Sequence, residues 1–208
     1  MPVISRYDCQ NLHVPSMPKA EDSLWDKAPK GELLEVVSGK TPFLATEFRF
    51  LRDDKQGALF LRFLAEDDEV RSTFRLNEEC LYRQDVFELF IAEGETLREY
   101  REIEVSPYDL HFTGDVVYEG SGKLKLNMDW DIPGFLTRTC HQKEKNLTSS
   151  VWRLPYAAFR TAPRSGTEWR VNLFRIDHSR RGEELQAWQA TGEANFHVPE
   201  RFGQLFFT

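Results

Sequence analysis

The chain has 208 residues, a formal net charge of −7, three cysteines and 40% hydrophobic residues. The negative charge argues against a nucleic-acid-binding surface, which requires a basic stripe, and no apolar run reaches the roughly 18 residues that predict a membrane-spanning helix. The three cysteines lie far apart in the sequence, so we expect small buried thiols in a reducing compartment. The first residues lack a charged start followed by an apolar stretch, so no secretion signal is expected, and the chain would be cytoplasmic if it is complete.

The N-terminal part combines a lead-in with short strands. Residues 1–22 are rich in proline and are expected to form an extended lead-in to a single domain at 23–208. Ser23 as a cap and Trp25 as an anchor predict one short helical turn. Acidic and glycine-containing turns then separate short strands, which are expected at 33–37, 42–52, 58–65 and 70–75.

Two central strands carry the pattern that is most informative about function. Residues 85–91 alternate between an apolar face and a face that carries Glu88, which is the two-residue period of a strand. The run at 100–106 repeats this arrangement, with Glu102 and Glu104 on its second face. Each strand therefore offers one face to a core and one face that carries carboxylates.

The rest of the chain is also expected to consist of short strands separated by turns. A turn is expected at 119–123, a short helical turn at 155–159 and a polar loop at 177–184. Ten or more short strands without a long helix predict an all-β sandwich or barrel. The strands expected in this part span 109–118, 135–142, 148–154, 168–176 and 202–207.

Six fragments stand out by their order and spacing. They are Leu24-Trp25-x-x-Ala28, Asp85-Val86-Phe87-Glu88-Leu89-Phe90, Tyr100-x-Glu102-Ile103-x-Val105-Ser106-Pro107, Leu154-Pro155-Tyr156-x-x-Phe159, the strand at 168–176, and Phe196-His197-x-Pro199-x-x-Phe202-Gly203 with the strand that follows it. Together they resemble a family 9 carbohydrate-binding module over almost the whole chain. The resemblance implies a jelly-roll-like antiparallel β-sandwich with short helical turns, which binds sugar ends without catalysis and holds structural calcium.

The resemblance also implies a slot in which two aromatic rings clasp a terminal sugar. Tyr82, six residues before Glu88, occupies the first ring position, where a sugar-clasping member is expected to carry tryptophan. Trp188 and Phe196 are both candidates for the second ring, and the spacing does not decide between them.

The second face of the strands offers polar groups for sugar hydroxyls, because charged partners make the stronger hydrogen bonds. By alternation this face carries Arg62, Glu88, Glu102, Glu104, Arg170 and Asn172. The competing interpretation is a solvated face of Glu–Arg pairs, each worth about 0.2–1 kcal/mol. The predicted contacts to a mono- or oligosaccharide are Tyr82, Glu88, Glu102, Arg170, Asn172 and Trp188.

Metal and catalytic signals are weak. No HExxH motif or Cys/His spacing predicts zinc, and no organic cofactor is expected. Acidic loops could furnish oxygen ligands for the calcium that the resemblance implies, although solvated turn carboxylates are the much commoner explanation. Two other functions stay open beside non-catalytic sugar binding: a degenerate module that acts as a protein-interaction scaffold, and a glycoside hydrolase that uses Glu88 and Glu102 as acid and base. The acidic loops are Asp53-Asp54, Asp67-Asp68 and Asp129-x-Asp131.

Overall fold

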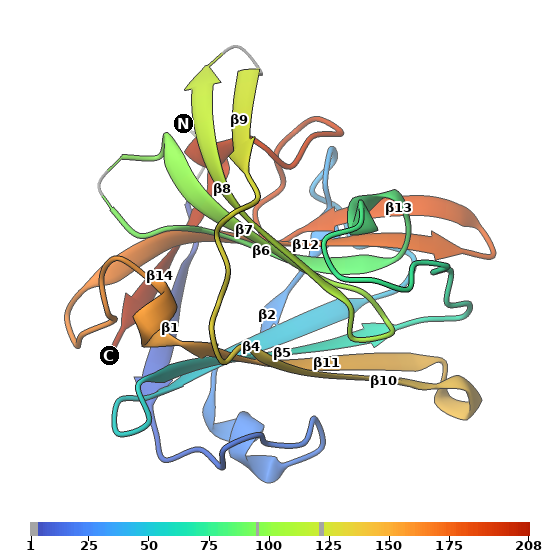
Figure 1. Ribbon diagram of the computed structural model, residues 1–208. Coiled ribbons are helices and arrows are strands. Elements are labelled where there is room, and N and C mark those ends of the chain that lie inside the picture. The colour runs from blue at the N-terminus through green and yellow to red at the C-terminus, as the bar shows by residue number, and fades with distance from the viewer. Residues whose placement is uncertain (1–3, 95, 121–122) are drawn as a thin grey trace.

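The computed structural model describes residues 4–94, 96–120 and 123–208, and over these residues it is a sandwich of two packed β-layers (Figure 1). The upper layer in Figure 1 contains, in spatial order, β14 (Gly203–Phe207), β12 (Glu168–Ser179), β6 (Val86–Ala92), β7 (Glu99–Val105), β8 (His111–Gly120) and β9 (Lys123–Asn127). β13 (Gly182–Ala187) also pairs with β12, and β3 (Leu34–Glu35) pairs with β13. The lower layer contains β10 (Leu136–Gln142), β11 (Leu147–Pro155), β5 (Ala58–Glu66) and β4 (Thr46–Asp53), with β2 (Gly31–Glu32) beside β4.

One strand joins the two layers. β1 (Arg6–Asn11) pairs in parallel with β14 of the upper layer and with β4 of the lower layer, whereas the other pairings are antiparallel. The extended lead-in expected at 1–22 therefore contains a strand that ties the sheets together. The predicted all-β, jelly-roll-like antiparallel sandwich with short helical turns is confirmed.

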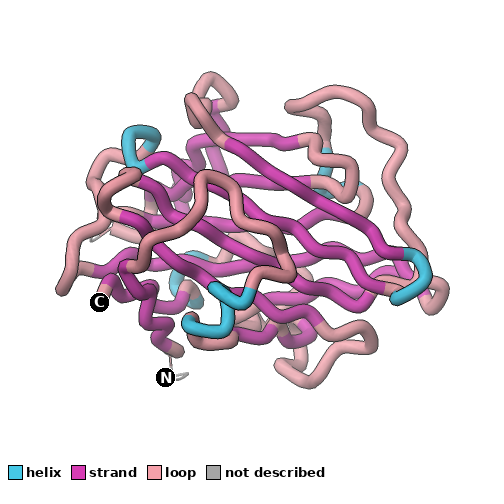
Figure 2. Tube along the Cα trace, turned by 90° about the horizontal axis from the view of Figure 1, so that it is seen from below, coloured by secondary structure: helices cyan, strands magenta, loops and turns pink. Residues whose placement is uncertain are grey.

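The helical content of the described residues consists of single 3₁₀ turns in the connections between strands (Figure 2). Because 3₁₀ helices this short make few internal hydrogen bonds, they connect strands and do not form a packing layer of their own. No helix is long and apolar enough to cross a membrane in the part of the chain that the structure describes. The turns are η1 (Ser23–Lys27), η2 (Leu81–Arg83), η3 (Lys143–Lys145), η4 (Tyr156–Ala158) and η5 (Pro199–Arg201).

Two sequence expectations about local structure are wrong, and one strand was not expected. Residues 70–75 do not form a strand, because the N–H groups of Arg71 and Thr73 donate to the side chains of Asp85 and Gln84 and not to a neighbouring strand. The polar loop expected at 177–184 is the end of β12 and the start of β13, which pair across a tight turn. β9 was not anticipated, and the turn expected at 119–123 includes residues 121 and 122, which lie outside the described part of the chain.

Aromatic side chains fill the space between the two layers. Phe63 of β5 and Phe87 of β6 stack across the interface with ring centroids 4.8 Å apart, and Trp152 packs beside them. On the outer face of the lower layer, Trp25 is fully buried against β4, β5 and β11. The alternation of apolar residues along each strand therefore points into this core, as the period-two pattern predicts.

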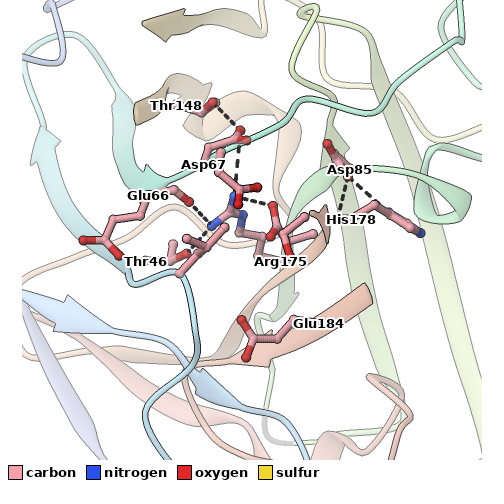
Figure 3. A network of polar contacts seen from close by, with 12 residues as sticks. Thr46, Glu66, Asp67, Asp85, Thr148, Arg175, His178 and Glu184 are labelled. Atoms are coloured by element: carbon pink, nitrogen blue, oxygen red, sulfur yellow. Dashed lines mark hydrogen bonds and ion pairs between the residues drawn. The ribbon is translucent and has the colours of Figure 1, made fainter. Parts of the chain in front are cut away.

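A buried arginine connects the layers at one end of the sandwich (Figure 3). The Arg175 guanidinium, on β12, donates to the Thr46 Oγ1 atom at 3.1 Å and to the Glu66 carbonyl at 2.8 Å, both on strands of the lower layer. It also pairs with Asp177 at 2.5 Å and lies 3.8 Å from Asp67. Since these groups are buried, the ion pair and its hydrogen bonds hold the two sheets at one separation.

The cysteines depart in part from expectation. All three are free thiols, and Cys9 is buried, but Cys80 and Cys140 are exposed. Burial raises the pKa of the Cys9 thiol, which keeps it protonated and inert.

Candidate ligand-binding site

A pocket opens on the outer face of the upper layer, above β6, β7 and β8. Strand alternation places Glu88 on this face of β6, and the antiparallel register sets it directly opposite Glu104 of β7. In the same register Glu102 lies opposite Phe90 of β6 and opposite Gly114 of β8. Three carboxylates from two adjacent strands therefore share one small area of the sheet.

The pocket encloses about 490 Å³, which is within the range of small-molecule sites. Its walls are mainly apolar, and the polar groups are concentrated at its floor and mouth. The lining residues are Glu78, Cys80, Tyr82, Glu88, Phe90, Glu102, Glu104, Phe112, Val116, Leu124, Leu126, Met128, Ile176, Leu185, Ala194, Asn195, Phe196 and His197.

The floor of the pocket is a cluster of three buried carboxylates, which we call the glutamate trio: Glu88, Glu102 and Glu104. Their side chains are 1%, 7% and 0% exposed, and one oxygen of each lies within 4.8 Å of the others. Among the described residues, the Oε1 atom of Glu88 and both carboxylate oxygens of Glu104 have no hydrogen-bond partner. Unpaired polar oxygens at this depth are costly, so the floor is built to receive a ligand or to hold protons.

The electrostatics of the glutamate trio follow from burial and mutual repulsion. Burial and then the charge of Glu102 raise the pKa of Glu88 well above its usual value, and burial followed by the charges of Glu88 and Glu102 does the same for Glu104. Burial raises the pKa of Glu102 to about 7. Without a positively charged partner, the trio therefore retains protons at neutral pH.

Two aromatic rings and a histidine stand at the mouth. Tyr82, in the turn η2, is 48% exposed, whereas Phe196 is nearly buried and stacks on Phe174 with ring centroids 4.2 Å apart. The Nδ1 atom of His197 lies 2.7 Å from the Tyr100 hydroxyl, and burial lowers the pKa of His197 to about 4. The imidazole is therefore neutral at physiological pH.

The structure brings together only half of the predicted contacts. Tyr82, Glu88 and Glu102 line the pocket, and their role in sugar binding stays a prediction. Arg170 and Asn172 do not line it, which corrects their predicted placement. The Arg170 guanidinium donates to the Phe202 carbonyl at 2.9 Å from Nε, and the Asn172 amide bonds the backbone of Gln189 on both its N–H and its carbonyl.

The prediction for Trp188 also needs correction. Its ring packs edge-on against Phe48 in the core between the sheets and is only 8% exposed. The part of the ring that reaches the surface borders a separate depression beside Ile4 and Gln189, away from the glutamate trio. The reason is the register of β13: Ala187 lies opposite Phe174 on the outer face, so the next residue, Trp188, points into the core.

The predicted second face is divided between the two layers. Arg62 lies on β5 of the lower layer, where its guanidinium donates to the Ala20 carbonyl and pairs with Glu47 at 2.7 Å. It therefore cannot meet Glu88, because alternation specifies a face of a strand and not the sheet to which that strand belongs.

Several lining residues were not singled out by the sequence. Glu104 lies on the carboxylate face of its strand but is not among the predicted contacts, and His197 appears only within the last fragment of the resemblance. Phe112 and Val116 follow the alternation of β8, which was the available signal for them. The wall formed by Leu124 and Leu126 comes from β9, and it approaches β8 at Gly114, where a side-chain methyl would lie 2.7 Å from Leu126 Cδ1.

In two of the three acidic loops, donors of the chain already occupy carboxylate oxygens that a calcium ion would need. The Asp53 carboxylate accepts the N–H groups of Val14 and Gln56, and the Asp67 carboxylate accepts the Thr148 hydroxyl at 2.5 Å. These oxygens are already used by donors of the chain. Within the described residues, the only three His, Cys, Asp or Glu side chains that converge closely enough to hold a metal ion are those of the glutamate trio.

Comparison with known proteins places this geometry among carbohydrate-binding folds. The model of a family described as "Carbohydrate family 9 binding domain-like" matches residues 19–208. A curated relative, an "Extracellular protein" of Arthroderma benhamiae, is 26% identical over 188 residues, which cover 83% of each chain. Two structures of a family 9 carbohydrate-binding module from Caldicellulosiruptor kristjanssonii, in complex with glucose and with cellotriose, superpose with a TM-score of 0.70 at 15% identity, over 98% of this chain and 96% and 94% of theirs. A Bacteroides uniformis protein with a proposed carbohydrate-binding role reaches a TM-score of 0.79 at 14% identity, over 99% of this chain and 100% of its own.

Proposed function

The chain belongs to the carbohydrate family 9 binding domain-like family, and from that premise we propose that it binds a mono- or oligosaccharide, without catalysis, in the pocket above the glutamate trio. Relatives of this fold have been solved with glucose and with cellotriose, which supports a sugar as the class of ligand. The observation that carries the proposal is that one pocket combines an exposed ring, Tyr82, with buried carboxylate oxygens that lack partners among the described residues.

The chemistry of a sugar matches this combination. A pyranose has an apolar face of C–H groups, which packs on an aromatic ring, and an edge of hydroxyls, which donate hydrogen bonds. In the proposal Tyr82 and Phe196 contact the apolar face at the mouth, while Glu88 and Glu102 accept hydroxyl protons at the floor. A protonated carboxyl group both donates and accepts hydrogen bonds, as a sugar hydroxyl does, so the protons that the trio retains do not prevent these contacts.

The accessibility of the site separates this proposal from the scaffold alternative. A degenerate module is expected to bury Tyr82 and Glu88 in packed protein and to leave no slot. Glu88 is buried, but Tyr82 is 48% exposed, and the two residues line a pocket together. This arrangement favours a small ligand over a flat contact with another protein.

Calorimetric titration of the folded protein with glucose and with cellotriose tests the proposal. Tyr82→Ala is expected to weaken sugar binding by about 1 kcal/mol, or roughly fivefold, which is the usual contribution of an aromatic contact. Tyr108→Ala is the matched control, because Tyr108 is an exposed tyrosine that does not line the pocket. Absence of binding to any mono- or disaccharide by the folded chain, or equal effects of the two substitutions, would contradict the proposal.

A further inference from the structure

The glutamate trio offers the oxygen ligands of a cation site but has no basic side chain among the residues that line the pocket with it. Of the eighteen described residues that line the pocket, none is lysine or arginine. Arg101, the basic residue next to Glu102 on β7, points to the opposite face of the strand, where it pairs with Glu93 and Asp115. His197 accepts or donates one hydrogen bond to Tyr100 and is neutral at physiological pH.

The free oxygens of the trio are a second observation that indicates a ligand. Glu104 is completely buried and both of its carboxylate oxygens lack a hydrogen-bond partner among the described residues, as does the Oε1 atom of Glu88. Structural carboxylates at this depth are normally paired with an arginine, a lysine or several N–H groups. Elsewhere in this chain that rule holds, since the buried carboxylate of Asp67 accepts a hydroxyl proton and lies 3.8 Å from the Arg175 guanidinium.

From this geometry we propose that Glu88, Glu102 and Glu104 bind a divalent cation of the size of Ca²⁺ at the floor of the pocket. Calcium takes oxygen ligands at about 2.3–2.6 Å, so two oxygens of one ion can be up to about 5 Å apart. The 4.8 Å limit on the separation of the three oxygens fits within that sphere. Magnesium gives up its water shell reluctantly, which disfavours it at the floor of so apolar a pocket.

The proposed cation site is distinct from the acidic loops, and one side of it is open to the pocket. Three glutamates from neighbouring strands approach the ion from the sheet, and calcium accepts six to eight oxygens, so the remaining coordination positions face the pocket. A pair of adjacent sugar hydroxyls has the donor atoms and spacing to occupy them. This consequence rests on the sugar binding proposed above, whereas the cation site itself does not.

Direct titration with calcium tests the cation site. The protein is first freed of metal with a chelator and then titrated with CaCl₂ in a calorimeter, and its thermal unfolding is recorded with and without the salt. We expect saturable binding near one ion per chain, a rise in the unfolding temperature with calcium, and a weaker response to MgCl₂. An unfolding temperature and a heat signal that do not respond to calcium would overturn the proposal.

Matched substitutions locate the ion. Loss of an outer partner of a metal ligand costs about 10–100-fold in affinity, and Glu104→Gln, which removes a direct ligand, is expected to cost at least that much. Glu102→Gln is the second variant and should act in the same way if Glu104→Gln does not fold. Glu78→Gln is the control, because Glu78 lines the same pocket outside the trio and its amide replacement can still accept the Thr113 N–H. Calcium affinity that is unchanged by both trio variants would place the ion elsewhere and overturn the assignment.

A titration with glucose, in calcium and in chelator, separates the two proposals. Sugar binding that requires calcium and is lost in Glu104→Gln supports both. Calcium binding at the trio with sugar affinity unaffected by the chelator keeps the cation site and removes its role in sugar recognition. Calcium binding at the trio without binding of any sugar leaves the cation site standing and overturns the function proposed for the pocket.

Discussion

Protonation of His197 is expected to destabilise the folded protein in mildly acidic solution. The imidazole lies at the pocket mouth, with its Nδ1 atom 2.7 Å from the Tyr100 hydroxyl and its ring 5.1 Å from that of Phe90. Burial in these surroundings lowers its pKa from 6.5 to about 4. Removing the titratable group with His197→Gln, whose side-chain amide can still bond Tyr100, should therefore change how stability depends on pH.

The sign and the size of the effect follow from linkage. Above pH 6.5 the imidazole is neutral in the folded and in the unfolded chain, so its contribution to stability is complete. As the pH falls below 6.5 the unfolded chain takes up the proton first, and stability is lost progressively until the pH reaches the folded pKa of about 4. One pKa unit corresponds to about 1.4 kcal/mol, so the loss is limited to about 3 kcal/mol.

Urea unfolding of both proteins, from about pH 8 to about pH 4, measures this loss. The difference between the two free energies of unfolding is the relevant quantity, because the raised pKa values of buried carboxylates act in the opposite direction in both proteins. We expect wild type to lose about 3 kcal/mol relative to His197→Gln over the range. A difference that does not vary with pH, or a pKa near 6.5 for His197 in an NMR titration, would refute the reasoning.

Three further substitutions test the packing around the site. Arg175→Met should lower the free energy of unfolding by about 3–5 kcal/mol, because it leaves buried carboxylates without their partner. Arg6→Met, at an exposed ion pair, is the control and should cost under about 1 kcal/mol. Equal urea midpoints for the two variants would count against a structural role for the buried arginine. Gly203→Ala places a methyl group 2.3 Å from the Trp188 ring and should cost about 1–3 kcal/mol in thermal unfolding, with a change in the near-ultraviolet circular dichroism of the tryptophan; an unaltered spectrum and unfolding temperature would show that the contact is absent. Phe196→Ala removes a nearly buried ring from its stack and should cost about 3 kcal/mol; a loss below about 1 kcal/mol in chemical unfolding would mean that the ring is not packed.

The architecture was predictable because strand alternation is a local signal. Residues 58–65, 85–91 and 168–176 alternate in side-chain character over many positions, and each became a strand whose apolar face enters the core. β13 was missed because it is rich in polar residues, and it is a strand only through its pairing with β12, which no local pattern encodes. The strand expected at 70–75 does not form, because the side chains of Gln84 and Asp85 accept hydrogen bonds from its backbone N–H groups.

The range of local signals also explains which of the predicted contacts line the pocket. Alternation placed Glu88 and Glu102 on the outer face, and the short connection between their strands made them neighbours, so their convergence needed no long-range information. Asn172 also lies on that outer face, opposite Phe90, yet it is sealed from the pocket by the chain after β13, whose Gln189 backbone it bonds. A strand pattern states which way a side chain points, but what covers that face is decided by a segment distant in sequence. Of the three predicted contacts that line the pocket, alternation identified the two on one hairpin, whereas Tyr82, in η2, came from the resemblance. Residues whose access to the pocket depends on a returning loop require the fold.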